Sequence, residues 1–336
     1  MNIPKRLKVS KFDPGRLNAD KGLKILGYFI LIMGKRGSGK TSVALDFMYY
    51  LQGHVDYAIA ISATASVSNV LKSIIPPVFV HKSGSPEFIS KLMTTQRKFI
   101  EQGSPKRMVL FIDDMAFDKK FLASEEFSEL IFNGRWYNVT VILTTQYSKA
   151  MPPGIRTNVD LCITMKQTNI IVKRAMYEEF FGIVTSKDFD KIMAQTTKNF
   201  QALVFDNRTQ ADNLDEVLFW FKANLAHLEP GKIKLVKPSF WALRMPRAGS
   251  LRTPSASHIA IGDQVGPVSM ADIDGQTIIS APKPRKRRAR GASSQVTSHA
   301  KATSSIKTTG RFPGQSTHGV LDDILEMPDD GVFHSE

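Results

Sequence analysis

The sequence predicts an α/β protein built on a doubly wound parallel sheet, and three observations carry that prediction. Runs of β-branched and apolar residues alternate with amphipathic stretches from residue 24 to about residue 225, a pattern typical of strands that alternate with helices. A glycine-rich segment at 34–41 lies between an apolar run and a helical stretch. A second apolar run, at 108–112, ends on two aspartates. Ligands of open α/β sheets bind at such strand ends.

The strands and helices of this region follow from the periodicity of its apolar residues. The expected strands are Tyr28–Met33, Tyr57–Ile61, Val78–Val80, Met108–Ile112, Val139–Thr144, Leu161–Met165 and Phe200–Phe205. The expected helices are Lys40–Leu51, Pro86–Glu101, Phe121–Asn133, Ile170–Phe181 and Ser186–Ala194. Several of these helices are preceded by Ser, Thr or Asp, which are suited to cap them.

The segment Gly34–Thr41 has the spacing G-x-x-x-x-G-K-[ST]. Its glycines allow consecutive backbone N–H groups to surround phosphate oxygens, and the following helix directs the positive end of its dipole at them. Lys40 is expected to reach the β- and γ-phosphates, and the Thr41 hydroxyl to coordinate Mg²⁺. An accidental glycine-rich turn is the alternative, but the flanking strand and helix argue against it. The expected nucleotide-binding residues are Gly34, Lys35, Arg36, Gly37, Ser38, Gly39, Lys40, Thr41 and Ser42.

The aspartates at 113 and 114 are the expected second half of the nucleotide site. Asp113 is expected to hold Mg²⁺ through water, and Asp114 to polarise the attacking water. An acidic pair after a strand is also an ordinary turn signal. About 70 residues separate Lys40 from Asp113 and contain two expected strands, which leaves room for an extra strand between the phosphate-loop strand and the acidic strand.

Three further polar residues flank the apolar run at 139–145 and are catalytic candidates. Gln146 ends that run, where an amide is able to bond both the γ-phosphate and the attacking water; a plain loop residue is the alternative. Arg135 precedes the run and Arg156 follows it. Either arginine is suited to neutralise charge on a transferring phosphoryl group, often from an adjacent subunit. Each is otherwise an ordinary structural or surface arginine.

Bulk composition limits the class of protein. The chain has 336 residues, and 42% of them are hydrophobic. Its net charge of +14 favours a polyanionic partner such as nucleic acid. Ribosomal or virion contacts would also explain that charge. The single cysteine, Cys162, excludes an internal disulfide framework, and the histidines show no metal-ligand spacing. The longest apolar run, Ile25–Met33, is far shorter than the ~20 residues that cross a bilayer, so no membrane partner is expected.

Composition also divides the chain into three parts. Residues 1–23 lack strand or helix periodicity and are expected to be an arm; residues 24–228 form the α/β domain. Residues 229–336 are rich in Ser, Thr, Pro and charge and are expected to be a largely disordered tail. Its basic run at 283–290 indicates a nuclear-import address, a DNA-contacting arm or a solvated charge cluster. Its stretch at 319–327 has apolar residues at helical spacing, typical of segments that fold on a partner.

Together these motifs resemble the poxvirus-type genome-packaging ATPases of large double-stranded DNA viruses, a branch of the FtsK/HerA superfamily. The most specific blocks are GRWYNVTVILTTQ at 134–146 and PPGIRTNVD at 152–160. The resemblance covers roughly residues 25–210 and implies a P-loop NTPase of the ASCE/RecA-like type. It implies ATP and Mg²⁺ as cofactors, Gln146 as sensor and Arg135 as the trans-acting arginine. Asp114 and Trp136 stand where relatives often carry Glu and His.

The resemblance implies an ATP-driven motor that packages double-stranded DNA into a preformed capsid. Its implied partners are duplex DNA, further copies of the chain in a ring, commonly a hexamer, and a capsid or portal protein that contacts the tail. The expected location is the virion or the host-cell assembly site, with the nucleus as an alternative because of the basic run. Other functions remain open: a helicase, a conjugation-type DNA-transfer motor, or a nucleotide-switched factor that tethers DNA during assembly.

Overall fold

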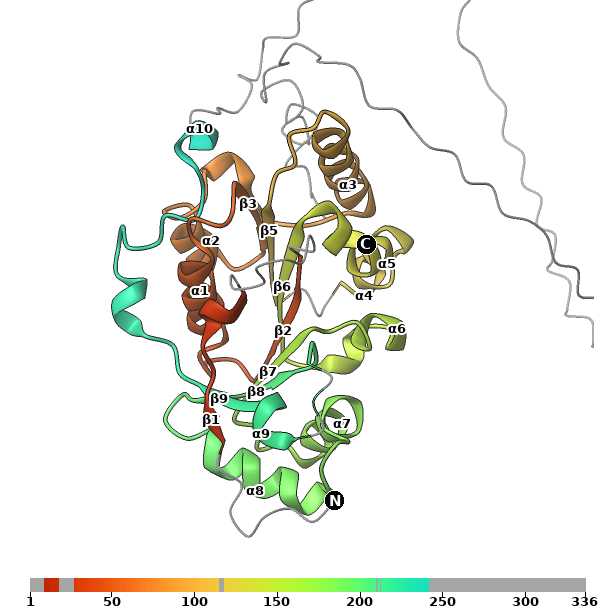
Figure 1. Cartoon of the computed structure of the whole chain (residues 1–336), viewed down its shortest axis with the longest axis vertical. Coiled ribbons are helices and arrows are strands. Elements are labelled where there is room, and N and C mark those ends of the chain that lie inside the picture. Colours follow the sequence, from red (N-terminus) through yellow and green to blue (C-terminus); the bar gives the residue numbers. More distant parts are fainter. Residues whose placement is uncertain (1–8, 18–26, 115–117, 210, 212, 242–336) are drawn as a thin grey trace, which may run out of the picture. The chain divides into compact units, whose positions relative to one another are not determined.

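A nine-stranded sheet is the centre of the computed structural model, which describes residues 9–17, 27–114, 118–209, 211 and 213–241 (Figure 1). The strand order is β1-β9-β8-β7-β2-β6-β5-β3-β4. The strands are β1 (Ser10–Lys11), β2 (Phe29–Met33), β3 (Tyr57–Ser62), β4 (Val80–His81), β5 (Met108–Asp113), β6 (Val139–Thr145), β7 (Leu161–Met165), β8 (Ala202–Asp206) and β9 (Leu218–Phe221).

The predicted α/β class is confirmed, but the sheet is not wholly parallel. Strand β8 runs antiparallel to both of its neighbours, β7 and β9, whereas every other pairing is parallel. Strands β9 and β1, which were not predicted from the sequence, extend the sheet beyond β8.

An extra strand does separate the phosphate-loop strand from the acidic strand, as predicted. That strand is β6, which pairs with β2 on one side and with β5 on the other. It follows the acidic strand in the sequence. The two strands within the 70-residue interval, β3 and β4, lie on the far side of β5 instead. The prediction was therefore right in outcome, but the interval that suggested it does not supply the strand.

Helices cover both faces of the sheet, with α1 and α2 on one side and α3 and α5 on the other (Figure 1). The expected helix Phe121–Asn133 is wrong as one element, because the Ser124 side chain accepts a hydrogen bond from Phe127 N and so begins a new helix. The α-helices are α1 (Lys40–Leu51), α2 (Ala65–Leu71), α3 (Pro86–Glu101), α4 (Lys119–Leu122), α5 (Glu125–Asn133), α6 (Pro153–Arg156), α7 (Ile170–Phe180), α8 (Ser186–Thr196), α9 (Leu214–Val217) and α10 (Pro238–Trp241). Short 3₁₀ helices are η1 (Pro14–Leu17), η2 (Pro77–Phe79), η4 (Gly134–Tyr137), η5 (Ser148–Ala150) and η6 (Leu225–Leu228).

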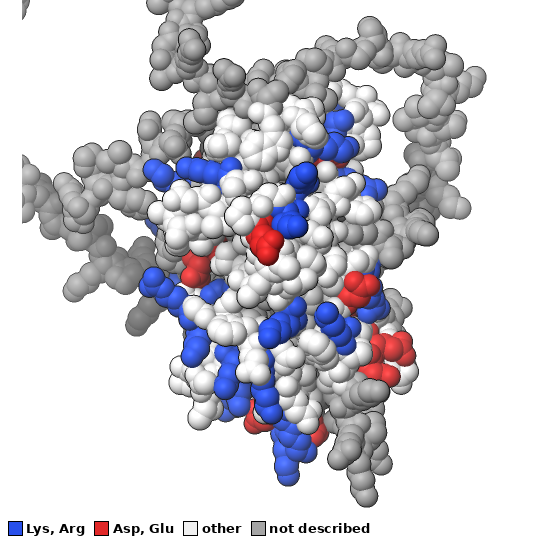
Figure 2. All heavy atoms as spheres, turned by 90° about the vertical axis from the view of Figure 1, so that its left-hand side faces the viewer, with Lys and Arg blue, Asp and Glu red and all other residues white. Residues whose placement is uncertain are grey.

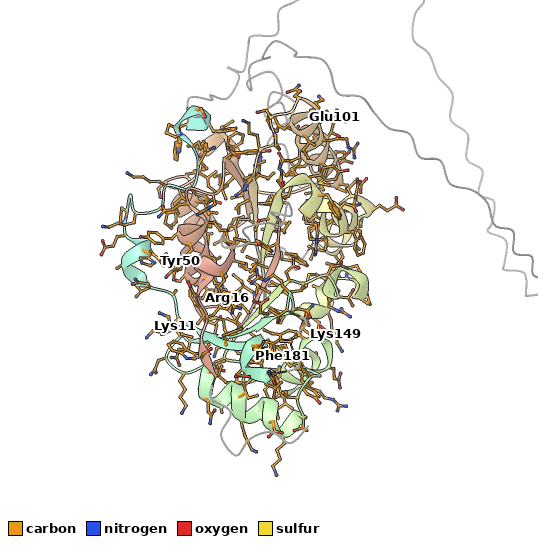
Figure 3. The ribbon with its side chains drawn as sticks, in the orientation of Figure 1. Lys11, Arg16, Tyr50, Glu101, Lys149 and Phe181 are labelled. Atoms are coloured by element: carbon orange, nitrogen blue, oxygen red, sulfur yellow. The ribbon has the colours of Figure 1, made fainter. Side chains whose placement is uncertain are left out.

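Packed structure extends past both of the expected domain boundaries. Within the expected arm, η1 lies against α1, and its Arg16 guanidinium, labelled in Figure 3, lies 5.1 Å from the centroid of the Phe219 ring. The Phe12 ring stacks on Phe47 with 6.0 Å between centroids. Beyond residue 228, the Phe240 ring stacks on the buried Tyr57 ring at 5.1 Å. The domain that packs together therefore includes residues 9–17 and 229–241, because aromatic side chains from both segments cover the flanks of α1 and the sheet.

The remaining expectations for the tail, including the runs at 283–290 and 319–327, lie outside the described residues. Within the part of the chain that the structure describes, no helix combines the length and apolar character needed to cross a bilayer.

Candidate nucleotide-binding site

The glycine-rich loop follows the carboxyl end of β2 and leads directly into α1. Gly34 N donates to the Thr145 carbonyl at 3.1 Å, so the loop leaves the sheet beside the end of β6. A Cβ atom on Gly34 would lie 2.6 Å from Ser38 Oγ, which excludes any side chain there. Gly39 has a φ of 96° and is the N-cap of α1, which has no side-chain cap. The first N–H groups of α1 are thus left for an anion.

Two loop side chains lie ready for phosphate oxygens. Lys40 is only 7% exposed, and its Nζ donates to the Gly34 carbonyl at 2.8 Å. Burial lowers the pKa of the Lys40 ammonium from its usual value, while the carboxylates of Asp114 and Asp113 oppose that shift. Ser38 Oγ is buried and has no hydrogen-bond partner among the described residues. A buried polar group without a hydrogen-bond partner costs free energy, so this hydroxyl and the nearby buried ammonium are suited to bind an anionic ligand.

Asp113 ends β5 and is held by hydroxyl groups on both neighbouring strands. Its Oδ1 accepts from Thr144 Oγ1 at 2.9 Å, and its Oδ2 accepts from Ser62 Oγ at 3.1 Å. Burial raises the pKa of the Asp113 carboxyl, and the two hydroxyl donors counteract part of that increase because they stabilise the charged form. Thr144 and Ser62 were not among the predicted site residues, although each is a hydroxyl residue near the end of a buried strand, which was a usable signal.

The residues at this sheet edge fit a magnesium ion. Thr41 supplies a hydroxyl oxygen and Asp113 a carboxylate oxygen, the hard oxygen donors that Mg²⁺ prefers. Among the described residues, no three His, Cys, Asp or Glu side chains form a metal-binding group. This is compatible with Mg²⁺ sites in which one or two protein oxygens act together with water and substrate phosphates.

Asp114 turns sharply away from the strand that precedes it. Its φ is 50°, in the left-handed region that Asp tolerates better than most residues. Its backbone N–H donates to the carbonyl and the hydroxyl of Thr144, at 3.1 and 3.0 Å. Its Oδ2 accepts from Gln146 Nε2 at 2.6 Å. Since Gln146 follows β6, the inserted strand carries this amide to the acidic pair. Its expected bonds to the γ-phosphate and to the attacking water stay predictions.

The two candidate arginines lie elsewhere. Arg135 belongs to η4, before β6, and its guanidinium bonds Asp160 Oδ1 at 3.2 Å, while Asp160 Oδ2 accepts from Phe29 N. These residues mark the amino edge of the sheet, opposite the loop and roughly 20 Å away along β6 at about 3.3 Å per residue. Arg135 therefore lies away from the loop of its own chain, so the trans-acting role that the resemblance implies stays a prediction.

Arg156 is engaged within its own chain. Its Nη1 donates to the Met151 carbonyl at 2.7 Å, and its Nε lies 3.5 Å from Glu179 Oε2. Its side chain is only 17% exposed. Burial of the guanidinium beside a buried carboxylate indicates a structural ion pair. The Arg135 side chain is more exposed, at 33%.

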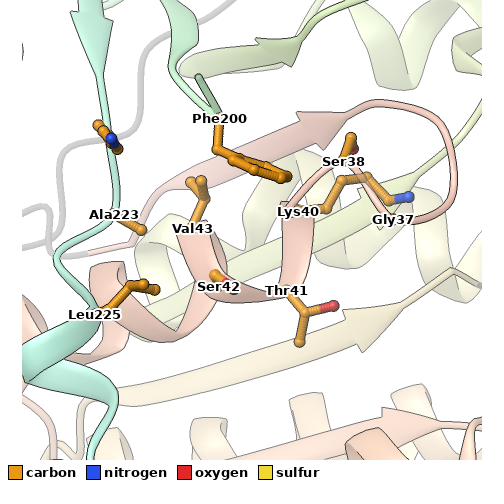
Figure 4. Close-up of a pocket in the computed structure, with 11 residues that line it drawn as sticks. Gly37, Ser38, Lys40, Thr41, Ser42, Val43, Phe200, Ala223 and Leu225 are labelled. Carbon is orange, nitrogen blue, oxygen red and sulfur yellow. The ribbon is translucent and has the colours of Figure 1, made fainter. Parts of the chain in front are cut away.

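A pocket of about 550 Å³ opens beside the loop and the start of α1 (Figure 4). Its far wall comes from residues that the sequence analysis did not consider, because they lie 160 or more positions further along the chain. These wall residues are Phe200, Lys222, Ala223 and Leu225.

The sheet order, the glycine loop and the acidic pair define a P-loop nucleotide-binding protein, in which a strand separates the loop strand from the acidic strand. No protein-family model matches the chain. In sequence the chain is similar to uncharacterised proteins of large DNA viruses. Uncharacterized protein L437 of Acanthamoeba polyphaga mimivirus is 29% identical over 65% of this chain and 78% of the relative. Uncharacterized protein 015R of Frog virus 3 is 28% identical over 65% of this chain and 68% of the relative.

Solved structures with a detectable likeness include the genome packaging NTPase B204 from Sulfolobus turreted icosahedral virus 2 in complex with ATP-gammaS. It is 19% identical, covers 55% of this chain and 94% of that chain, and has a TM-score of 0.42. The pCW3 conjugation coupling protein TcpA, in its monomer form with ATPgS, is 17% identical, covers 69% of this chain and 74% of that chain, and has a TM-score of 0.46. Both likenesses are weak.

Proposed function

We propose that this protein is an Mg²⁺-dependent ATPase that moves duplex DNA into a viral capsid. The observation that carries the proposal is the meeting of Asp113, Asp114 and Gln146 beside the phosphate loop, at the carboxyl edge of β5 and β6. The two halves of the site are joined through β6, because Gly34 N of the loop donates to the Thr145 carbonyl and the next residue, Gln146, bonds Asp114. The similarity to proteins of large DNA viruses supports the viral setting.

Each residue of the site has a separate role in the proposed hydrolysis of ATP. The open N–H groups of the loop and Lys40 bind the β- and γ-phosphates and stabilise the charge that develops on the transferred phosphoryl group. Asp114 accepts hydrogen bonds and orients the attacking water. Bound Mg²⁺, held through Thr41 and Asp113, would neutralise phosphate charge. Gln146 bonds Asp114 here, and an alternative bond to the γ-phosphate would report whether that phosphate is present.

A ring of copies, such as a hexamer, supplies the arginine that the site of one chain lacks. Arg135 lies at the opposite sheet edge from its own loop, where it is available to the loop of a neighbour. Hydrolysis would then change the geometry of an interface between subunits, and that change is what moves DNA. An arginine supplied in trans contributes about 10³–10⁵ to the turnover of related phosphoryl-transfer enzymes.

Charge favours duplex DNA as the polymer that is moved. The chain carries +14 overall, and Lys and Arg side chains gather over the lower half of the face in Figure 2. Contacts to phosphates are tolerant of sequence and weaken steeply with salt. Both properties suit a motor that must move along an entire genome.

The test is the ATPase rate of the full-length protein with and without duplex DNA. We expect turnover that requires Mg²⁺, that duplex DNA stimulates and that Lys40→Ala abolishes. Lys232→Ala, which changes an exposed lysine far from the loop in sequence, is the matched control and should behave as wild type. Slow turnover that ignores DNA would instead favour a nucleotide-switched assembly factor, and strand separation without translocation would favour a helicase.

A further inference from the structure

We propose that the pocket beside the loop binds the base of the nucleotide and that Phe200 stacks on it, a purine being preferred. The inference rests on the proposed nucleotide-binding function and extends it to base recognition, for which the sequence offered no candidate. It combines a strained aromatic turn, the position of that turn over the loop, and an opposing wall that is tied to α1.

Phe200 occupies a backbone position that normally favours glycine. Gln201 N donates to the Lys198 carbonyl at 2.9 Å and closes a tight turn, whose two central residues, Asn199 and Phe200, have φ values of 51° and 62°. Positive φ at both central positions is the pattern of a type I′ turn, in which the second position is usually glycine. A phenylalanine there costs conformational energy, and its side chain is 67% exposed, so burial in the core does not compensate. Backbone strain of this kind is found preferentially where a ligand is held.

The turn places the phenyl ring over the start of α1. Phe200 Cδ1 lies 3.5 Å from the point that a Cβ atom on Gly39 would occupy. Figure 4 shows the ring projecting above the loop near Lys40, with Val43 below it. A nucleotide whose phosphates bind the loop N–H groups would therefore have its sugar and base directed along a surface that already carries an exposed aromatic face.

Aliphatic side chains form the other side of the same pocket. Ala223 and Leu225 line it from the segment after β9, and Leu225 is 71% exposed. Figure 4 shows both on the opposite side of Val43 from the loop. Phe200 and Leu225 are both exposed and line the same pocket. A flat base bound between them would contact apolar surface on each of its two faces.

Hydrogen bonds connect the segment that carries Ala223 and Leu225 to α1, the helix that begins at the phosphate loop. Asp46, in the middle of α1, is 1% exposed; its Oδ2 accepts from Asn224 N at 2.8 Å, and its Oδ1 lies 2.8 Å from His227 Nδ1. The His227 ring stacks on Tyr49 with 3.8 Å between centroids. Because Lys40 and Asp46 belong to one helix, the distance between the phosphate site and the wall is set within that helix and not by a flexible loop.

The chemistry of the lining predicts the specificity. Beyond the loop, the described residues that line the pocket are Ser42, Lys222 and apolar side chains, with no carboxylate or amide among them to read the edge of a base. Stacking is tolerant of base identity. The ammonium of Lys222 donates only, and N7 is an acceptor that adenine and guanine share. We therefore expect ATP and GTP to bind within about threefold of each other, and CTP to bind more weakly because its smaller ring stacks less well.

The experiment is equilibrium binding of ATP and of inorganic tripolyphosphate, each with Mg²⁺, to wild-type protein, Phe200→Gly and Phe200→Trp. Phe200→Gly should weaken ATP binding about tenfold, within the range for loss of one base–aromatic stack, and leave tripolyphosphate binding within about twofold. It should leave the thermal midpoint unchanged or raised, because glycine relieves the positive φ. Phe200→Trp should bind ATP as wild type does. Phe132→Ala, which removes an aromatic side chain 44% exposed on α5 and outside the pocket, is the control.

The outcomes separate the subsite from the function on which it rests. If tripolyphosphate binds the wild type and Lys40→Ala abolishes that binding, but Phe200→Gly binds ATP as tightly as wild type, the base subsite is refuted and the phosphate loop stands. If neither ATP nor tripolyphosphate binds the wild type, the proposed function itself fails. Equal loss of ATP and tripolyphosphate in Phe200→Gly would also overturn the inference, since it would indicate a disturbed loop rather than a lost stack.

Discussion

Gln146 Nε2 donates a hydrogen bond to Asp114 Oδ2 across 2.6 Å, which joins the ends of two adjacent strands. The contact exists because β6 lies between β2 and β5: the Thr145 carbonyl accepts from Gly34 N of the loop, and the next residue, Gln146, reaches the acidic pair. In the proposed mechanism Asp114 orients the attacking water, and Gln146 exchanges its bond to Asp114 for one to the γ-phosphate.

Gln146→Ala should slow hydrolysis more than it weakens binding. Loss of the amide removes one hydrogen bond to Asp114 and any bond to the γ-phosphate, which we expect to lower kcat by about 10²-fold, a typical loss for one positioned donor. ATP binding should change by no more than about threefold, because the loop N–H groups and Lys40 remain. Steady-state and single-turnover rates measure the change in kcat. The control is Gln102→Ala, at the exposed end of α3. Full turnover by Gln146→Ala would show that Gln146 has no role in hydrolysis.

Asp114→Asn should bind ATP and hydrolyse it poorly. Asparagine tolerates the positive φ at this position, so the turn should be retained and the change confined to the carboxylate. Loss of the group that orients and polarises water should cost about 10²–10⁴ in rate. Equilibrium binding and single-turnover hydrolysis, measured on one preparation, test both parts. Normal turnover by this variant would place the general base elsewhere.

Thr144→Val should shift the pH dependence of Mg²⁺-dependent turnover. Burial raises the pKa of Asp113, and the hydrogen bond from Thr144 Oγ1 counteracts that increase by stabilising the carboxylate. Without the hydroxyl the pKa rises further, so at a given acidic pH less of Asp113 is ionised and able to hold Mg²⁺. The acid limb of the profile should therefore move to higher pH, and raised Mg²⁺ should partly restore the rate. An unchanged acid limb would show that Asp113 does not control it.

Arg135→Ala should abolish the ATPase activity of a ring, and mixing these subunits with Asp114→Asn subunits should partly restore that activity. Rings assembled from Arg135→Ala and Asp114→Asn subunits contain some interfaces with an intact loop site and an intact arginine, so partial ATPase activity should return. Asp160→Asn is the control for the intramolecular ion pair, and it should cost stability while retaining most turnover at permissive temperature. Absence of activity in mixed rings, or an equal loss in Asp160→Asn, would assign Arg135 a structural role within its own chain.

Local patterns in the sequence predicted much of the site. The bounds of α1 and α3 agree with the structure, and Lys40, Asp113, Asp114 and Gln146 lie together as expected. Each of these follows from a signal within a few residues, such as a glycine that fixes a turn or a polar residue that ends a buried strand. The break at Ser124 was the comparable local signal that was missed.

The sequence by itself determined the phosphate loop and the strand ends around it. Glycine positions and runs of apolar residues are local features, and they specify a turn or a strand without reference to distant segments. Only the tertiary structure decided that β6 separates β2 from β5, that Arg135 faces Asp160 at the far edge of the sheet, and that Phe200 lies over the start of α1. These relationships join segments up to about 160 residues apart. Strand order and packing between distant segments are settled by the burial of whole faces, and no short stretch of sequence records that outcome.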